Sequence, residues 1–229
     1  MNEQKQSLSI PLAIIIAGAL IGFGLYWSGR GSAPAPAVAD TAPKTTTDGI
    51  KAVTSSDYVL GNRNAQIMIV EYSDLECPFC KQYQSVLHQI VNAYPGKVAW
   101  AFRHFPVHTN SIPEAEALEC AGEIGGNDAF WKYADRVFQE TTSNNGLDLS
   151  KLPQFAADLG IDKSQFAACA ASNKYESKIT ADRQEALSTG TRGTPYSVIF
   201  AGGDKISLDQ GALPFEAMKN IIDTVLKNS

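Results

Sequence analysis

The sequence predicts an α/β domain in which a small mixed sheet carries a helical insertion. Three observations lead to this prediction. A strand–helix–strand pattern occupies residues 66–105, a long stretch of helical periodicity occupies about residues 111–190, and a hairpin followed by a helix ends the chain. A strand–helix–strand unit implies a parallel strand pair, and its crossover needs only one helix. The longer helical stretch is therefore expected to be an insertion.

The first part of the predicted domain contains three strands and one helix. A short strand covers residues 58–60, and the apolar run at 67–70 marks a buried central strand at 66–72. Apolar residues then recur at one-face spacing up to Tyr94, which predicts a helix. A turn at Pro95-Gly96 leads into a strand at 97–105.

The second part is helical until a closing hairpin. Several apolar faces mark the insertion, beginning with Ile112, Ala115 and Leu118. Gly125-Gly126 is expected to stop a helix. Strands at 196–200 and 205–208 flank a turn, which predicts a hairpin. The last helix is expected to begin near Pro214.

The N-terminal segments predict a membrane anchor followed by a linker, whereas the cysteines are the stronger indication of export. A tail at 1–9 precedes an apolar stretch at 10–27, which is long enough to span a membrane. Residues 28–56 are rich in Ala, Pro and Thr and predict a flexible linker, so that the folded domain covers 57–229. The alternative is a cleaved signal peptide with its site at Ala37-Val38-Ala39.

Composition excludes some partners and suggests disulfides. The net charge is −5 and no cluster of Lys or Arg occurs, which argues against nucleic acid as a partner. The chain has four cysteines. In an exported protein an even number suggests two pairs, Cys77–Cys80 and, by elimination, a structural disulfide between Cys120 and Cys169. Buried free thiols at Cys120 and Cys169 are the alternative.

The motif Cys77-Pro78-Phe79-Cys80 falls where the central strand has ended and a helix begins. Free backbone N–H groups and the positive end of the helix dipole favour a thiolate on the first sulfur. Pro78 suits the first helical turn, where its missing N–H is not needed. This arrangement predicts thiol–disulfide exchange in which Cys77 attacks and Cys80 resolves.

A zinc site is the competing interpretation of the same cysteines. His104 and His108 have an acceptable ligand spacing. However, residues 81–103 separate them from Cys80, which is more than the roughly 12–15 residues of the finger pattern. We therefore predict no metal site.

The stretch Glu71-Tyr72-Ser73-Asp74-Leu75-Glu76, followed by the Cys77–Cys80 motif and much later by Gly193-Thr194-Pro195, resembles the DsbA-like branch of the thioredoxin superfamily. It is similar to the bacterial, membrane-anchored members in particular. The resemblance implies a thioredoxin-like fold with a helical insertion domain, and no cofactor other than the redox-active disulfide. It also implies a cis Thr194-Pro195 bond beside the sulfurs, and a buried Glu71 that accepts a proton from Cys80.

These site assignments have simpler alternatives. Pro195 can be an ordinary proline at a strand start, and Glu71 a solvated strand end. Asp74 and Glu76 are expected to be surface residues. The resemblance implies that the substrate-binding residues are Thr194, Pro195, Pro78 and Phe79.

The resemblance also implies a location and partners. We expect a monomer with a single membrane span in the bacterial cytoplasmic membrane and its catalytic domain on the exported face. Its partners would be exported client proteins with free cysteines and a membrane protein that reoxidises Cys77–Cys80. An oxidase is the preferred direction, although Phe79 stands where the best-known oxidase has a histidine. A tethered reductase and a metal-binding or metallochaperone module remain as alternatives.

Overall fold

The structure of the chain is a computed structural model, and it describes residues 46–228. The predicted tail at 1–9, the predicted anchor at 10–27 and most of the predicted linker lie outside the described residues. Within 46–228, no helix has both the length and the apolar character needed to cross a membrane.

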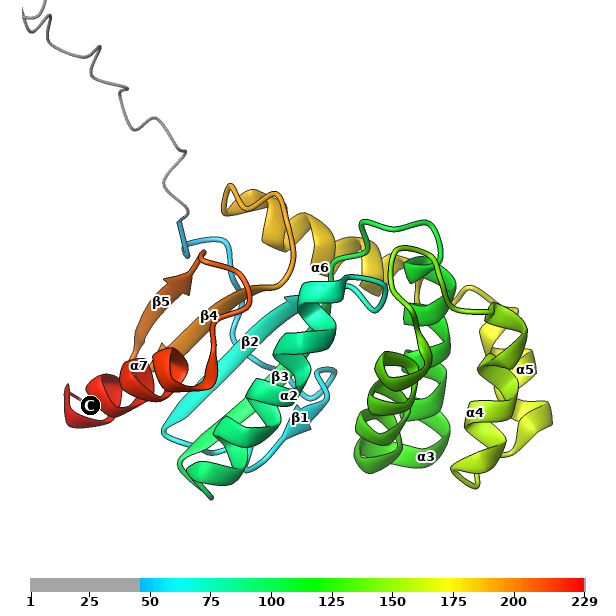
Figure 1. Cartoon of the computed structure of the whole chain (residues 1–229), viewed down its shortest axis with the longest axis horizontal. Coiled ribbons are helices and arrows are strands. Elements are labelled where there is room, and N and C mark those ends of the chain that lie inside the picture. Colours follow the sequence, from blue (N-terminus) through cyan, green and yellow to red (C-terminus); the bar gives the residue numbers. More distant parts are fainter. Residues whose placement is uncertain (1–45, 229) are drawn as a thin grey trace, which may run out of the picture. The chain divides into compact units, whose positions relative to one another are not determined.

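The core of the fold is one five-stranded mixed sheet with the strand order β1-β3-β2-β4-β5 (Figure 1). Its strands are β1 Val59–Leu60, β2 Ile67–Ser73, β3 Val98–His104, β4 Tyr196–Ala201 and β5 Asp204–Leu208. The pair β2–β3 is parallel, and the other three pairs are antiparallel. This confirms the predicted mixed sheet, in which the crossover connects the central strand β2 to its parallel neighbour β3.

Helices cover both faces of the sheet, and strand alternation explains why. Helices α2 (Pro78–Ala93) and α7 (Phe215–Asn228) lie on one face and α6 (Glu176–Ser188) on the other (Figure 1). Ile67 and Ile69 of β2 belong to the apolar cluster beneath α2 and α7. Their neighbours Met68 and Val70 point to the opposite face and pack in the cluster with Ala186 of α6. Because β2 is buried on both faces, its sequence begins with a continuous apolar run and does not alternate between apolar and polar residues.

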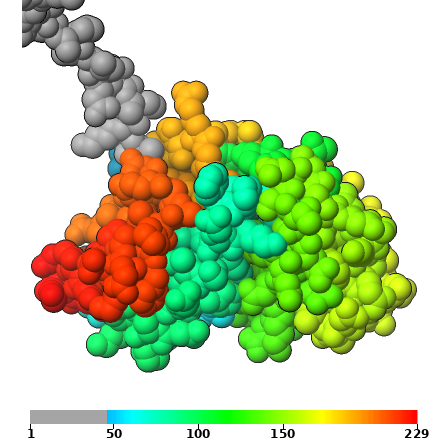
Figure 2. All heavy atoms as spheres, in the orientation of Figure 1, coloured from blue at the N-terminus to red at the C-terminus, as the bar shows by residue number. Residues whose placement is uncertain are grey.

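Most of the insertion forms a helical layer beside α2. This layer contains α3 (Ser111–Glu140), a short 3₁₀ turn at Leu149–Lys151, α4 (Leu152–Asp158) and α5 (Lys163–Ala170), and the last helix of the insertion, α6, covers the opposite face of the sheet. In the space-filling view this layer, green to yellow, lies on one side of α2, and α7 lies on the other (Figure 2). A disulfide joins Cys120 of α3 to Cys169 of α5, with 5.8 Å between their Cα atoms.

The predicted stop at Gly125-Gly126 is confirmed. The segment α3 consists of two helices that are separated at Gly126, whose φ of 79° lies in the left-handed region that glycine adopts freely. The Asn110 side chain, just before the segment, donates to the carbonyls of Asn145 and Leu147, just after it, so the chain reverses direction between the two helices. The prediction for Ile112 is wrong, because this residue, expected on a buried face, is 50% exposed.

Residues 46–56, which the sequence assigns to the linker, lie against the domain. Ile50 is buried, and its carbonyl accepts a hydrogen bond from Lys205 Nζ at 2.7 Å. The backbone N–H of Thr46 donates to the carbonyl of Thr189 at 2.9 Å. The partners of this segment come from distant parts of the chain, so its local composition gives no sign of them.

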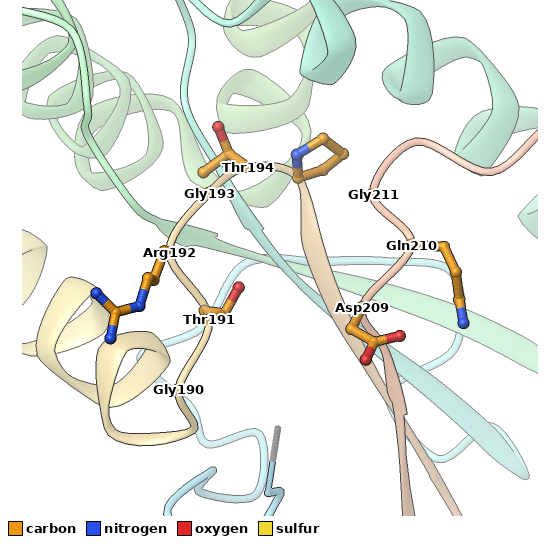
Figure 3. A pocket seen from close by; sticks show the side chains of 9 residues that line it. Gly190, Thr191, Arg192, Gly193, Thr194, Asp209, Gln210 and Gly211 are labelled. Atoms are coloured by element: carbon orange, nitrogen blue, oxygen red, sulfur yellow. The ribbon is translucent and has the colours of Figure 1, made fainter. Parts of the chain in front are cut away.

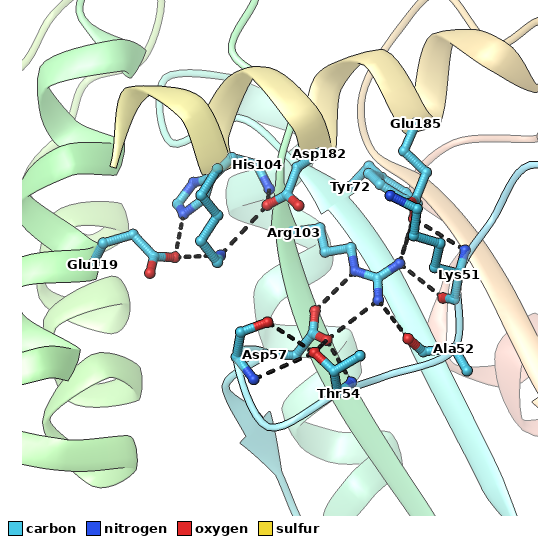
Figure 4. Close-up of polar contacts among 12 residues, drawn as sticks. Lys51, Ala52, Thr54, Asp57, Tyr72, Arg103, His104, Glu119, Asp182 and Glu185 are labelled. Atoms are coloured by element: carbon cyan, nitrogen blue, oxygen red, sulfur yellow. Dashed lines mark hydrogen bonds and ion pairs between the residues drawn. The ribbon is translucent and has the colours of Figure 1, made fainter. Parts of the chain in front are cut away.

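Arg103 of β3 fastens the same segment to the sheet (Figure 4). Its guanidinium donates to the carbonyls of Lys51 and Ala52 at 3.0 and 3.2 Å. It also forms ion pairs with Asp57 at 2.8 Å and with Glu185 of α6 at 2.5 Å. All three charged side chains are almost fully buried, and the several hydrogen bonds supply the pairing that buried charges require.

Candidate active site

Cys77 and Cys80 lie where the chain passes from β2 into α2. Both are present as thiols. Cys77 caps α2 with an extended backbone, and Pro78 follows as the first helical residue. Cys77 is 5% exposed and Cys80 is fully buried. Only the first cysteine can therefore be reached from outside, as in a pair of attacking and resolving thiols.

The two thiols have opposite pKa shifts. A hydrogen bond from Cys80 is the largest effect on Cys77, and further bonds from Thr194 and from the backbone N–H groups of Cys80 and Phe79 bring its pKa to about 6. Burial and the neighbouring Cys77 raise the pKa of Cys80 well above the usual thiol range. At neutral pH Cys77 is mostly the thiolate and Cys80 is the thiol.

The Thr194-Pro195 segment lies beside Cys77. The peptide bond between these residues is cis. Cys77 Sγ and the backbone carbonyl oxygen of Thr194 are 3.5 Å apart, and Cys77 donates to this carbonyl when it is protonated. The fold thus brings together the motif and the Thr-Pro segment that the sequence analysis assigned to one site.

A cavity of about 450 Å³ continues from the same segment (Figure 3). The 190–195 loop and the 209–211 loop form its walls. The Arg192 side chain points away from Asp209 on the opposite wall (Figure 3). The ring of Phe79, two residues after Cys77, is 60% exposed. The motif thus presents an exposed aromatic ring, and the Thr194-Pro195 segment that contacts Cys77 lines a polar cavity.

Glu71 lies inside the sheet, two strand positions before Ser73. It pairs in register with Phe102 of β3 and Ser197 of β4, and its side chain is fully buried. Neither of its carboxyl oxygens has a hydrogen-bond partner among the described residues. Burial raises its pKa to about 8, with the charge on Cys77 as a smaller effect in the same direction. Such a carboxyl can take up or release a proton near neutral pH.

Asp74 is buried, contrary to the expectation that it is a surface residue. Its carboxylate accepts hydrogen bonds from the backbone N–H groups of Val107 and His108 at 2.6 and 3.0 Å and from the Ser111 hydroxyl at 2.5 Å. These donors belong to the segment that follows β3. Asp74 therefore holds that segment beside the start of α2.

Glu76, the residue before Cys77, is also fully buried, which corrects a second expectation. It accepts hydrogen bonds from the backbone N–H groups of Gly146 and Leu147, both at 3.0 Å. Burial raises its pKa, but the hydrogen bonds outweigh burial and hold it below the usual value. Burial and the adjacent Glu76 raise the pKa of Glu114 to about 10, so Glu114 is protonated at neutral pH. In the sequence, the sign of these two buried carboxylates is a pair of acidic residues, Asp74 and Glu76, directly before the motif. Their burial depends on hydrogen-bond donors from distant parts of the chain, which the local sequence does not reveal.

The histidines of the zinc alternative lie in other interactions. His104 is buried and its Nε2 lies 2.9 Å from Glu119 Oε1, while His108 Nδ1 lies 3.1 Å from Asp74 Oδ2. Within the part of the chain that the structure describes, no group of three or more His, Cys, Asp or Glu side chains is placed to hold a metal ion.

Comparison with known proteins gives the same family from sequence and from structure. A family model described as thioredoxin matches residues 53–224. The crystal structure of Pseudomonas aeruginosa DsbA2 superimposes with a TM-score of 0.65 at 31% sequence identity, covering 77% of this chain and 98% of that protein. Wolbachia pipientis α-DsbA1 superimposes with a TM-score of 0.68 at 24% identity, covering 80% of this chain and 97% of that protein, which supports the fold.

Among curated sequences, the chain resembles part of much longer proteins. The Na(+)/H(+) antiporter NhaA of Herminiimonas arsenicoxydans is 30% identical over 139 residues, which cover 61% of this chain and 21% of the antiporter. The chain thus spans about a fifth of the length of this curated relative. With the paired thiols beside the Thr194-Pro195 segment, the family match over most of the domain and the superposition on DsbA2, the chain belongs to the thioredoxin family as a DsbA-like protein thiol-disulfide oxidoreductase.

Proposed function

We propose that this protein is a dithiol oxidase that introduces disulfides into exported client proteins through Cys77 and Cys80. The observation that carries the proposal is the asymmetry of the two thiols. Cys77 has a pKa of about 6 at the start of α2, whereas the pKa of the buried Cys80 is raised. Stabilising the Cys77 thiolate stabilises the reduced protein, which makes its disulfide the stronger oxidant.

The reaction begins with the Cys77–Cys80 disulfide. A client thiolate attacks Cys77 Sγ, a mixed disulfide forms, and the bond to Cys80 breaks with the electron pair going to Cys80. A second client thiolate then attacks the client sulfur of the mixed disulfide and releases Cys77 as a thiolate. The client is oxidised by two electrons and the Cys77–Cys80 pair is reduced by two.

Glu71 is proposed to supply and accept the proton of Cys80. When Cys80 leaves as a thiolate, the protonated Glu71 carboxyl gives it a proton. When the pair is reoxidised by a partner disulfide, Cys77 attacks first, and the Glu71 carboxylate takes the proton from Cys80 so that Cys80 can resolve the mixed disulfide. The raised pKa of Glu71, about 8, suits both directions near neutral pH.

Client recognition is assigned to Pro78, Phe79, Thr194 and Pro195. The exposed ring of Phe79 can pack on an apolar client side chain next to the reacting cysteine. Thr194 and Pro195 line the cavity beside Cys77, and Thr194 contacts the sulfur. An extended client segment can pair with backbone atoms there and place its cysteine at Cys77.

The location proposed is the exported face of the bacterial cytoplasmic membrane. The apolar stretch at 10–27 would serve as a single-pass anchor and residues 28–45 as part of the tether. The Cys120–Cys169 disulfide supports an oxidising compartment. A membrane redox partner would restore the Cys77–Cys80 disulfide after each cycle. We propose that the protein acts as a monomer.

Disulfide transfer to a reduced client tests this function. The oxidised full-length protein is mixed with a reduced, unfolded protein that contains two cysteines, and both are analysed after acid quenching. One client disulfide should form for each Cys77–Cys80 disulfide lost. Cys77→Ser should abolish transfer, whereas the double variant Cys120→Ala/Cys169→Ala should retain it. Transfer that survives Cys77→Ser would contradict the proposal.

A further inference from the structure

Ser73 lies on the same face of β2 as Glu71, directly below the start of α2. Residues two apart in a strand point to the same side. Ile67 and Ile69 of this face pack in one apolar cluster with Cys77, Cys80 and other residues of α2. Glu71 and Ser73 continue the same row toward the end of the strand that leads into Cys77. The row thus ends with a carboxyl and a hydroxyl under the two cysteines.

Ser73 is a buried hydroxyl without a bonding partner. It is 2% exposed, and among the described residues its Oγ has no hydrogen bond of normal geometry. The oxygens of Glu71 have none either. Most buried polar side-chain atoms are hydrogen-bonded, so two such neighbours on one strand call for an explanation. Because nothing else holds the Ser73 proton, the hydroxyl is free to turn toward either neighbour.

The neighbours of Ser73 are the two groups that exchange a proton in the proposed reaction. Burial raises the pKa of Glu71, and the Ser73 hydroxyl partly opposes this rise. Burial likewise raises the pKa of Cys80, and Ser73 again opposes it. The Ser73 hydroxyl thus stabilises both the carboxylate of Glu71 and the thiolate of Cys80.

We infer that Ser73 is a proton-relay residue that connects the Glu71 carboxyl with the Cys80 sulfur during thiol–disulfide exchange. This inference rests on the proposed function and adds to it the route of the proton. A hydroxyl suits the task because it donates one hydrogen bond while it accepts another.

The relay conserves protons and electrons in both directions. When the Cys77–Cys80 bond breaks, the Cys80 thiolate takes the Ser73 hydroxyl proton, and the Ser73 oxygen takes the proton of the Glu71 carboxyl. Cys80 ends as a thiol, Ser73 is unchanged and Glu71 becomes a carboxylate. In the resolving step the two proton transfers run in reverse, and the freed electron pair of Cys80 forms the bond to Cys77 while the partner sulfur of the mixed disulfide leaves as a thiolate with the electron pair of the broken bond.

The experiment follows the resolving step separately from the first attack. The reduced full-length protein is mixed with oxidised glutathione, samples are quenched in acid over time, and mass spectrometry counts the free thiols, the glutathione mixed disulfide and the Cys77–Cys80 disulfide. The first attack depends on Cys77, whereas conversion of the mixed disulfide depends on removal of the Cys80 proton. The time course is repeated from pH 6 to pH 9.

Ser73→Ala should leave the first attack unchanged and slow the resolving step. Proton transfer by a positioned group contributes about 10²–10⁴-fold, so loss of the relay with Glu71 still present should slow this step by at least about tenfold. In the wild type its rate should rise with pH and level off above about pH 8, where Glu71 is ionised. In Ser73→Ala the rate should keep rising, because hydroxide must then remove the Cys80 proton directly.

Two further variants test whether a slower resolving step in Ser73→Ala comes from the lost hydroxyl or from altered packing. Ser73→Thr keeps the hydroxyl and should restore the rate to within about threefold of the wild type. Ser197→Ala removes the buried, unpartnered hydroxyl that stands opposite Glu71 on β4, and it tests whether loss of any hydroxyl beside Glu71 slows resolution; if the relay runs through Ser73, both steps should stay unchanged in Ser197→Ala. An unchanged resolving step in Ser73→Ala, or a Ser73→Thr variant as slow as Ser73→Ala, would overturn the inference alone. A wild type that forms neither the glutathione mixed disulfide nor the Cys77–Cys80 disulfide would overturn the proposed function and the inference with it.

Discussion

The Cys77 thiol and the backbone carbonyl of Thr194 lie 3.5 Å apart, although 117 residues separate them in the sequence. The Thr194 side chain also acts on the sulfur, since its hydrogen bond is one of the effects that lower the pKa of Cys77. The same segment lines the cavity beside the motif. A client chain bound at this cavity therefore contacts the residues that tune the attacking sulfur.

The pKa of Cys77 should depend on Cys80. The thiol of Cys80 is the largest cause of the low pKa of Cys77, about 6. Cys80→Ala should raise the pKa of Cys77 and slow its alkylation at pH 7. The measurement is the rate of alkylation by iodoacetamide from pH 4 to pH 10. If Cys77 had the same pKa in the wild type and in Cys80→Ala, the start of α2 and Thr194 would be enough to lower it without Cys80.

Glu71→Gln should stabilise the folded protein more at high pH than at low pH. The pKa of Glu71 rises from 4.5 to about 8 on folding, so the unfolded state loses its proton first. The stability associated with Glu71 is complete below pH 4.5 and is lost as the pH rises through 8. Each pKa unit corresponds to about 1.4 kcal/mol. The difference between Glu71→Gln and the wild type should thus grow by an amount on the order of a few kcal/mol between pH 5 and pH 8.

Urea unfolding of the oxidised proteins at pH 5 and pH 8 measures this difference. The oxidised form is used because it removes the Cys77 thiolate from the comparison. If the difference in free energy of unfolding between Glu71→Gln and the wild type were the same at both pH values, Glu71 would ionise at the same pH in the folded and unfolded chains.

The central motif and the strands around it could be predicted from local pattern alone. An apolar run that ends before Cys77, and a proline that fits the first helical turn, are both visible within a few neighbouring residues. The Thr194-Pro195 segment could not be placed beside the sulfur in this way. Its position follows from the pairing of β4 with β2, which links distant parts of the chain, and only the family resemblance predicted it.

Asp74 and Glu76 show why the rest of the site was missed. An acidic residue in a polar stretch is usually solvated, and burial becomes favourable only when several donors meet the carboxylate. The donors to Asp74 follow β3, and those to Glu76 lie at residues 146–147. Residues 46–56 were assigned to the linker because their binding partners also lie far away in the sequence. Their partners, Arg103 and Lys205 among them, come from separate strands.

Arg103 should be important for stability, because it joins Asp57, Glu185 and the backbone at 51–52 inside the domain. Removing one partner of a buried ion pair typically costs about 3–5 kcal/mol, since a buried charge is left unpaired. Arg103→Met should lower the free energy of unfolding by about this amount. Lys219→Met, which removes the surface ion pair with Asp223, is the matched control and should leave the free energy of unfolding nearly unchanged. Equal losses in the two variants would contradict a structural role for the Arg103 contacts.

The disulfide of the insertion should contribute to stability and not to exchange. It joins α3 to α5 across a sequence separation of 49 residues. On the chain-entropy model a loop of this length contributes about 4 kcal/mol. Cys120→Ala/Cys169→Ala should thus unfold at a lower denaturant concentration while its Cys77–Cys80 pair keeps the wild-type reduction potential. A shift in that potential would link the insertion to the chemistry of the active site.

The reduction potential of Cys77–Cys80 should lie between those of the strongest oxidase and of thioredoxin. The low pKa of Cys77 favours the reduced form, but Phe79 offers no hydrogen bond to the thiolate through its side chain. A charge-assisted hydrogen bond contributes about 1.5–3 kcal/mol, and about 30 mV corresponds to 1.4 kcal/mol for a two-electron couple. Phe79→His should therefore raise the potential by about 30–65 mV, whereas Phe79→Leu, which adds no donor, should leave it nearly unchanged. Equilibration with glutathione buffers at pH 7 measures all three proteins. A wild-type potential near about −270 mV, the value of thioredoxin, would reverse the proposed direction of electron flow and make the protein a reductase.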